Sequence, residues 1–215
     1  MILNKQGFDL WADGYDQTVQ LSEENNQYPF AGYKAILNKI FNEVMENPAS
    51  TVLDIGFGTG VLTAKLYEHG HPISGFDFSS NMIAIAKGKM PQANLIEWDL
   101  TKGLPPALLQ QQYDAIISTY ALHHFTDEQK GEYISQLLQH LTPNGKILIG
   151  DVAFETREQL EKCRYDSRGY WDDDEFYFVH EELKSLLQDI CQLTFYPLSH
   201  CGGVFVISGL PKDPA

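Results

Sequence analysis

Hydrophobic and polar positions follow two different periodicities along the chain. Residues 1–20 and 28–47 have the spacing of helices, and Pro48 marks the end of the second. From residue 51 onward, short apolar runs typical of buried strands alternate with helical segments. The predicted strands are 51–55, 72–78, 94–98, 113–121 and 145–153, and the predicted helices between them are 60–69, 80–89 and 127–141.

Alternation of strand and helix predicts parallel strands joined by right-handed crossovers, so we expect a doubly wound α/β sheet. The sequence "HLTPNG" (140–145) predicts a helix end and a turn before the fifth strand. Residues 193–210 predict a hairpin around Gly202 and Gly203, which would close one sheet edge with antiparallel pairing. The aromatic and acidic segment 154–178 either covers a site or is a surface excursion.

The chain has 215 residues, of which 43% are hydrophobic, and this suits one domain with a full core. It has no run of 18 or more apolar residues of the kind a membrane helix needs, and its start lacks the pattern of a secretory signal. Its three cysteines form no C-x-x-C pair, which disfavours a disulfide scaffold or a zinc site. We therefore expect a cytoplasmic protein.

The formal net charge is −14, and no basic cluster interrupts the acidic trend. A protein that grips a nucleic-acid backbone needs concentrated Lys and Arg, and anionic membranes attract the same residues. We therefore expect neither nucleic acid nor membrane as a partner, and favour small neutral or cationic ligands or other proteins. The alternative is that the acidic residues simply keep the surface soluble.

The segment "TVLDIGFGTGVLTAKL" (51–66) places glycines where a strand passes into a helix. Gly56, Gly58 and Gly60 form G-x-G-x-G, and such a turn lets the backbone approach a ligand closely. A dinucleotide fold would need glycine at position 61, where this chain has Val61, and no Lys-Ser/Thr of a P-loop follows. The turn therefore predicts a ligand other than a dinucleotide or a nucleoside triphosphate.

Three acidic residues end three successive predicted strands. Asp54 precedes the glycine turn, Asp77 ends the second strand and Asp99 follows the third. Asp77 is placed to accept hydrogen bonds from ribose hydroxyls, and Asp54 would repel a pyrophosphate but suit an ammonium group. Together they predict a nucleoside with a cationic tail. Each has an alternative: Asp54 as a structural or capping acid, Asp77 as a helix cap like the serines after it, and Asp99 as a loop acid.

With these features the chain resembles the class I S-adenosylmethionine (SAM)-dependent methyltransferases. The resemblance rests on the ordered motifs "LDIGFGTG", "GFDFS", "EWDL", "YDAIISTYALHHF" and "LTPNGKILIGD", over roughly residues 50–153. The segment "FDLWADGYDQTV" resembles the start of a group of small, largely uncharacterised bacterial members. The family implies a Rossmann-like, seven-stranded, mostly parallel sheet with an antiparallel C-terminal hairpin strand, helices on both faces and an N-terminal helical lid.

The resemblance also implies roles for individual residues. Asp54 and the Gly56–Gly60 turn would hold the methionine part of SAM, and Asp77 would bind the ribose with Phe78 beside the adenine. Asp99 and the Leu100 backbone would read the adenine edge, Ser118 would lie under the methionine part and Tyr15 would close over the cofactor. Alternatively, Phe78 is a core residue, and Tyr15 forms with Trp11 an amphipathic stripe.

His123 and His124 follow the fourth strand and are the candidates for a general base. The alternative is that they order the loop through hydrogen bonds. Adjacent histidines converge on a metal ion only if a carboxylate or third ligand lies nearby, so we expect no metal. In "GYWDDDEFYF" (169–178) the aromatic and acidic residues could surround a cationic substrate or form a solvated turn, and His200 is expected to be structural.

These observations predict one methyltransferase domain, 1–215. Its parts are an N-terminal helical cap (1–48), a cofactor-binding core (50–153), an insertion or lid (154–180), and a C-terminal helix and hairpin (181–210). The expected reaction is in-line transfer of a methyl group from SAM to a small-molecule acceptor, releasing S-adenosylhomocysteine (SAH). The alternative is a SAM- or SAH-binding protein without catalysis that acts as a partner or sensor. A nicotinamide oxidoreductase is disfavoured by Val61, and no oligomeric state is predicted.

Overall fold

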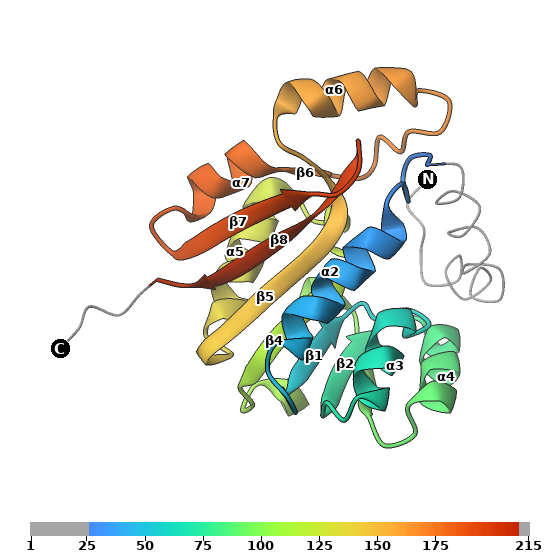
Figure 1. Ribbon diagram of the computed structural model, residues 1–215, viewed down its shortest axis with the longest axis vertical. Helices are drawn as coiled ribbons and strands as arrows, with labels where there is room; N and C mark the ends of the chain where they lie inside the picture. Colours follow the sequence, from blue (N-terminus) through green and yellow to red (C-terminus); the bar gives the residue numbers. More distant parts are fainter. Residues whose placement is uncertain (1–25, 211–215) are drawn as a thin grey trace.

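The computed structural model describes residues 26–210, so the predicted helix 1–20, with Trp11 and Tyr15, lies outside the described residues. An eight-stranded sheet has the order β3-β2-β1-β4-β5-β8-β7, with β6 paired to β5 (Figure 1). The strands are β1 (Val52–Ile55), β2 (Ile73–Asp77), β3 (Asn94–Glu97), β4 (Tyr113–Thr119), β5 (Leu141–Phe154), β6 (Phe178–Val179), β7 (Cys191–Pro197) and β8 (Gly202–Gly209). The helices are α2 (Tyr33–Met45), α3 (Val61–Glu68), α4 (Ser80–Lys89), α5 (Asp127–Leu138), α6 (Arg157–Asp166) and α7 (His180–Leu187), with short 3₁₀ turns η1 (Leu100–Lys102), η2 (Pro106–Leu108) and η3 (Leu122–His124).

Strand pairing confirms the predicted Rossmann-like fold. The strands from β1 to β5 pair in parallel, β8 runs antiparallel to β5, and β7 runs antiparallel to β8. Strand β1 lies between β2 and β4, so the order along the sheet reverses at β1. In doubly wound folds the crevice for a ligand opens at such a switch point, beyond the carboxyl ends of the strands.

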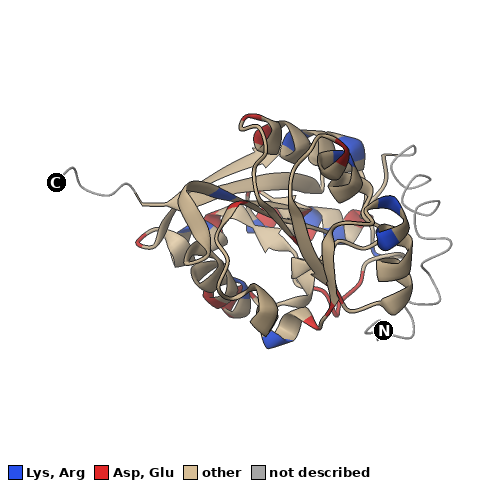
Figure 2. Ribbon diagram, turned by 90° about the horizontal axis from the view of Figure 1, so that it is seen from below, with Lys and Arg blue, Asp and Glu red and all other residues tan. Residues whose placement is uncertain are grey.

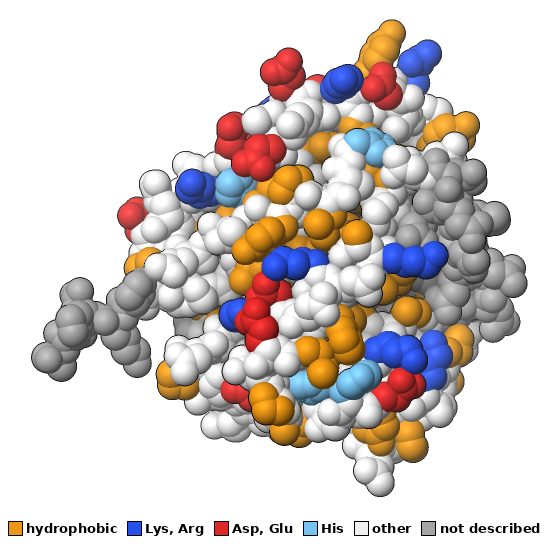
Figure 3. All heavy atoms as spheres, viewed as in Figure 1, with side chains coloured by type: hydrophobic (Ala, Val, Ile, Leu, Met, Phe, Trp, Pro, Cys, Tyr) orange, Lys and Arg blue, Asp and Glu red, His pale blue; other side chains and the backbone are white. Residues whose placement is uncertain are grey.

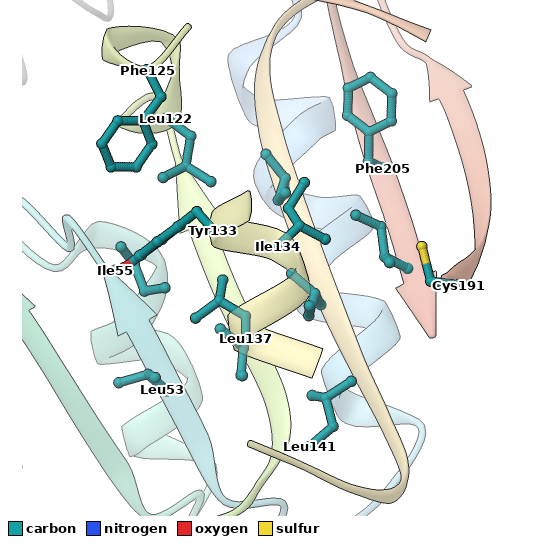
Figure 4. Close-up of a cluster of buried hydrophobic side chains, with 14 of the residues drawn as sticks. Leu53, Ile55, Leu122, Phe125, Tyr133, Ile134, Leu137, Leu141, Cys191 and Phe205 are labelled. Carbon is teal, nitrogen blue, oxygen red and sulfur yellow. The ribbon is translucent and has the colours of Figure 1, made fainter. Parts of the chain in front are cut away.

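Two hydrophobic layers hold the sheet between the helices. Leu53 and Ile55 of β1 pack with α5 (Figure 4) and belong to the same cluster as residues of α7, while Val52 packs with α2, α3 and α4 on the opposite face. This alternation follows from the two-residue period of a strand. It places Asp54 on the same face as Val52, toward α3. The central strand is therefore buried on both faces, as the continuous apolar run in its sequence predicts.

Helix α2 and strand β5 depart from the predicted boundaries. Helix α2 begins at Tyr33 rather than residue 28, because Gly32 before it adopts a positive φ of 76°. The predicted turn at 140–145 is wrong, since β5 already begins at Leu141, which pairs with Tyr113. The pairing register shifts after that contact, and a Cβ on Gly145 would lie 2.7 Å from the Tyr113 carbonyl oxygen. The expected turn is thus an irregular start of the strand.

The C-terminal hairpin is confirmed, but its turn lies earlier than predicted. The backbone N–H groups of Leu198 and Ser199 donate to the carbonyl oxygen of Gly202, so the turn precedes the two glycines. Gly202 and Gly203 instead begin β8. A Cβ on Gly202 would lie 2.9 Å from Ile36 Cδ1 of α2. Glycine is needed here for close packing of a helix on the strand.

Residues 154–178 form an anchored part of the fold. Thr156 caps α6 by accepting a hydrogen bond from the Gln159 N–H, and β6 then pairs with the end of β5. A third hydrophobic cluster joins the segment to the first described residues, because Tyr28 stacks on Trp171 with ring centroids 5.0 Å apart. The Lys130 ammonium of α5 donates to the carbonyl oxygen of Phe176. The segment is therefore anchored to the rest of the fold at several points.

The charged side chains are dispersed over the described part of the chain. Figure 2 shows acidic and basic residues interspersed among helices and loops, and the face in Figure 3 mixes them with hydrophobic side chains. Among residues 26–210, none of the helices combines the length and hydrophobicity that spanning a bilayer requires.

Candidate functional site

A groove opens beyond the carboxyl ends of β1, β2 and β4, at the switch point of the sheet. Two adjoining hollows form it and share Gly56, Gly58, Thr119 and Tyr120. The first is also lined by Phe76, Asp77, Phe78, Met82, Trp98, Leu100, Ala121 and His124. The second is also lined by Tyr33, Leu37, Asp54, Phe57, Thr59, Val61, Leu62 and Thr63. Among the residues that the structure describes, neither lining contains Lys or Arg.

The glycine turn forms the floor that the two hollows share. Gly56, Gly58 and Gly60 all have positive φ, at 70°, 55° and 72°, a region that other residues enter only with strain. A Cβ on Gly56 would lie 2.7 Å from the Cβ of Ala121, whereas a Cβ on Gly58 would extend into open space. At Gly56 and Gly58 the turn therefore presents backbone, without a side chain, to the groove.

Asp54 is a buried carboxylate beside this turn. Its Oδ2 accepts a hydrogen bond from the Thr63 hydroxyl, and its Oδ1 has no hydrogen-bond partner among the described residues. Burial raises the pKa of Asp54 to about 7, the Thr63 hydrogen bond opposes the rise, and the charge of Asp77 adds to it. An unsatisfied buried carboxylate oxygen is costly. A cationic ligand group in the second hollow would stabilise it.

Asp77 joins the glycine turn to the second strand. Its Oδ2 accepts a hydrogen bond from the Gly58 N–H at 2.9 Å, and its Oδ1 accepts one from the Ser79 N–H at 2.8 Å. The cap of helix α4 is Ser79, whose hydroxyl accepts from the Met82 N–H at 3.2 Å. Asp77 is therefore not the helix cap, and its buried carboxylate lines the groove.

The residues after β2 and β3 form an aromatic wall. Phe78 lines the groove and belongs to none of the buried hydrophobic clusters, so it is not a core residue. Trp98 also lines the groove, and its indole N–H donates to the Gly103 carbonyl oxygen at 2.9 Å. Leu100 also lines the groove. A flat, apolar ring system would fit between such side chains.

Asp99 and Ser118 lie outside the groove lining. The Asp99 carboxylate accepts hydrogen bonds from the N–H and hydroxyl of Thr101, and the hydroxyl bond lowers the pKa of Asp99 most. It thereby caps the short turn η1. The Ser118 hydroxyl donates to the Ile55 carbonyl oxygen at 3.0 Å and so joins β4 to β1. Each side chain therefore already has a hydrogen-bond partner within the protein.

His123 and His124 have different environments although they are adjacent. His123 is buried, and its Nδ1 lies 2.7 Å from Asp151 Oδ1. Burial alone would lower the pKa of His123, but the charge of Asp151 and the hydrogen bond to it raise that pKa above its ordinary value. His124 lines the groove, and crowding by protein atoms together with the charge on His123 lowers its pKa to about 4. Of the two histidines, His124 is the one that meets the groove.

Glu175, from residues 154–178, meets the histidine pair. Its Oε1 lies 3.4 Å from His123 Nε2, and its Oε2 accepts a hydrogen bond of 2.6 Å from the Tyr177 hydroxyl. The Tyr177 hydroxyl also contacts the Tyr28 hydroxyl. The backbone N–H of Phe176 donates to the His123 carbonyl oxygen at 2.7 Å. The segment is thus tied to the loop beside the groove.

Known proteins share this chain's sequence and fold. A family model described as a methyltransferase domain matches residues 52–145. Over 163 residues, the chain is 39% identical to an uncharacterised methyltransferase of Geobacillus sp. strain WCH70, covering 75% of this chain and 73% of that one. The chain belongs to the methyltransferase family. An uncharacterised methyltransferase of Geobacillus kaustophilus is 35% identical to this methyltransferase over 187 residues, covering 83% and 84% of the two chains.

Solved structures confirm the fold of this methyltransferase. The DhpI–SAH complex superposes with a TM-score of 0.72 at 16% identity, covering 97% of this chain and 96% of that one. Magnesium protoporphyrin IX methyltransferase (ChlM) from Synechocystis PCC 6803 with bound SAH gives a TM-score of 0.63 at 19% identity, covering 83% and 84%.

Sequence reasoning missed several groove residues of this methyltransferase: Met82, Trp98, Thr119, Tyr120 and Ala121. Thr119 is the last residue of β4, and Tyr120 and Ala121 follow it, so the rule that strand ends face the ligand could have found them. Met82 lies on the first turn of α4, and nothing in its spacing separates it from a core methionine.

Proposed function

We propose that this methyltransferase binds SAM in the groove and transfers its methyl group to a small-molecule acceptor. One observation carries the proposal: two buried carboxylates, Asp54 and Asp77, flank a glycine turn in a groove whose lining, among residues 26–210, has no Lys or Arg. A phosphorylated ligand would meet like charge there. A nucleoside with a cationic tail and no phosphate would meet complementary charge.

The residues of the groove fit SAM from one end to the other. Asp54 Oδ1, which has no partner among residues 26–210, would accept from an ammonium group, and the glycine turn leaves room for the amino-acid part. Asp77 is held by two backbone N–H groups and would accept hydrogen bonds from the ribose hydroxyls. Phe78 and Trp98 would enclose the adenine. The solved complexes of DhpI and ChlM with SAH support the same cofactor here.

Asp99 and Ser118 are each replaced in the proposed site by the residue that follows them. We assign Leu100 rather than the Asp99 carboxylate to the adenine end of the groove, because Leu100 lines it and Asp99 caps η1. Thr119 rather than Ser118 would lie beside the methionine part, because Thr119 lines both hollows. The proposed role of Tyr15 concerns a residue outside the described part of the chain.

The acceptor would enter beside His124. SAM supplies a methyl group on a sulfonium, so the protein must align the acceptor, exclude water and take up a proton where the acceptor loses one. His124 lines the groove, and its pKa of about 4 keeps the imidazole neutral at pH 7, so that it can accept a hydrogen bond from the acceptor. His123, held by Asp151, would position this loop.

Transfer can be tested without naming the acceptor. The full chain is incubated with methyl-labelled SAM and separate small-molecule and macromolecular fractions of a bacterial extract, and mass spectrometry follows the label. We expect a protein-dependent labelled product in the small-molecule fraction and none with Asp77→Asn. SAM binding without any labelled product would favour the non-catalytic alternative. A product confined to macromolecules would contradict a small acceptor.

A further inference from the structure

The histidine loop and the segment 154–178 bring three metal-ligating side chains together. Ligand atoms of His123, His124 and Glu175 all lie within 4.8 Å of one another. The two imidazole ring centroids are 4.4 Å apart and their planes are tilted by 64°. Adjacent histidines lack a third ligand in the sequence, and the fold supplies it from a distant segment.

We propose that His123, His124 and Glu175 form a binding site for a divalent transition-metal ion, of the zinc class, at the acceptor end of the groove. His123 Nε2 and Glu175 Oε1 are 3.4 Å apart. Two ligands of one tetrahedral zinc ion, each about 2.1 Å from it, are separated by about 3.4 Å. That edge of the site already has the length required for one ion, and the ligand atom of His124 lies within 4.8 Å of the other two.

The surroundings of the three ligands match those of metal sites. His123 uses Nδ1 toward Asp151, which leaves Nε2 toward Glu175. A carboxylate behind a ligating histidine fixes its tautomer and orientation. Glu175 has its second oxygen held by the Tyr177 hydroxyl at 2.6 Å, which fixes the carboxylate. Oriented ligands of this kind lower the cost of organising a site around an ion.

The site is accessible and leaves coordination positions open. His124 is exposed and lines the groove, and the side chain of Glu175 is 20% exposed. Three protein ligands leave a tetrahedral ion one position for a water or another molecule, as in catalytic zinc sites. If the proposed function holds, that position would bind an oxygen or sulfur of the acceptor and favour its deprotonated form. Metal binding itself does not depend on the proposed function.

Cobalt(II) is the probe, because its spectrum separates this site from a second cluster. Cys163, Cys201 and His200 also lie within 4.8 Å of one another, and thiolate ligation of cobalt gives intense charge-transfer absorption that nitrogen and oxygen ligands do not. The full chain, stripped with a chelator, is titrated with Co²⁺ by calorimetry and absorption. We expect binding of one ion with weak visible bands, retained in Cys163→Ser and weakened at least tenfold in Glu175→Gln and His124→Gln.

A matched control is Glu161→Gln, which makes the same change at an exposed glutamate in the same segment and should bind Co²⁺ like the wild type. SAH titration of each variant reports folding of the groove independently of the metal. The proposal is overturned if the wild type does not bind Co²⁺, or if Glu175→Gln binds it unchanged. It is also overturned if the absorption is that of thiolate ligation and disappears in Cys163→Ser.

Discussion

At the scale of single residues, the buried carboxylate of Asp54 lowers the stability of the fold, so its position calls for another explanation. It is buried in the central strand with one carboxylate oxygen lacking a partner among the described residues, and its pKa is raised to about 7. Because the folded-state pKa lies above the unfolded value near 4, the folded chain binds a proton that the unfolded chain releases. Stability from this group is complete below about pH 4 and is lost as the pH rises through about 7.

Asp54→Asn should therefore stabilise the unliganded protein while removing cofactor binding. We expect the free energy of unfolding at pH 8 to rise by about 1 to 3 kcal/mol, because a neutral amide carries no charge-burial penalty. At pH 4 the advantage should disappear. Urea denaturation at the two pH values measures it, and Thr63→Val, which removes the hydroxyl that Asp54 accepts from, should shift stability in the opposite direction. If Asp54→Asn were less stable than the wild type at pH 8, this view of Asp54 would be contradicted.

At the scale of elements, close backbone packing decides where helix α2 lies. A Cβ on Gly150 of β5 would fall 2.4 Å from Ile36 Cγ2 and 2.9 Å from Ile40 Cδ1. Ile36 and Ile40 are fully buried, so neither side chain has free space into which to move. Gly150 therefore allows α2 to cover β5 beside the site.

Gly150→Ala should destabilise the fold by about 1 to 3 kcal/mol, the usual cost of overpacking a filled core. Gly131→Ala is the matched control, because Gly131 lies inside α5 and a Cβ there would contact nothing within 4 Å. Replacing a helical glycine by alanine gains roughly 0.5 to 1 kcal/mol. Chemical denaturation should thus give opposite signs for the two variants; equal effects would show that contact with α2 is not the cause.

Local periodicity explains which elements could be predicted. Helix α4 matches its predicted range of residues 80–89, and every predicted parallel strand exists, because each has an apolar run bounded by turns. The errors fall where tertiary contacts override local signals. The pair Gly202-Gly203 is typical of a turn, but Gly202 instead allows close packing against Ile36. The turn-like sequence at 142–145 is incorporated into the start of β5.

At the scale of the whole molecule, the site combines residues that no local pattern connects. Asp54, Gly58 and Asp77 were predictable, because the carboxyl ends of neighbouring parallel strands must meet at one edge. Glu175 was not, since its approach to His123 depends on how residues 154–178 return over the sheet. The roles proposed for Asp99 and Ser118 followed their motif positions, whereas Asp99 accepts a hydrogen bond from Thr101 two residues on and Ser118 donates to Ile55 of the neighbouring strand.

The most direct test of the account is calorimetric titration of SAH into the full chain and into Asp77→Asn, with Glu128→Gln as a control at an exposed acid on α5. The account predicts one bound SAH per chain for the wild type and the control. It predicts at least tenfold weaker binding for Asp77→Asn, which loses the charge that faces the ribose. Equal binding by a correctly folded Asp77→Asn, or no binding by the wild type, would contradict the claim that this groove holds the cofactor.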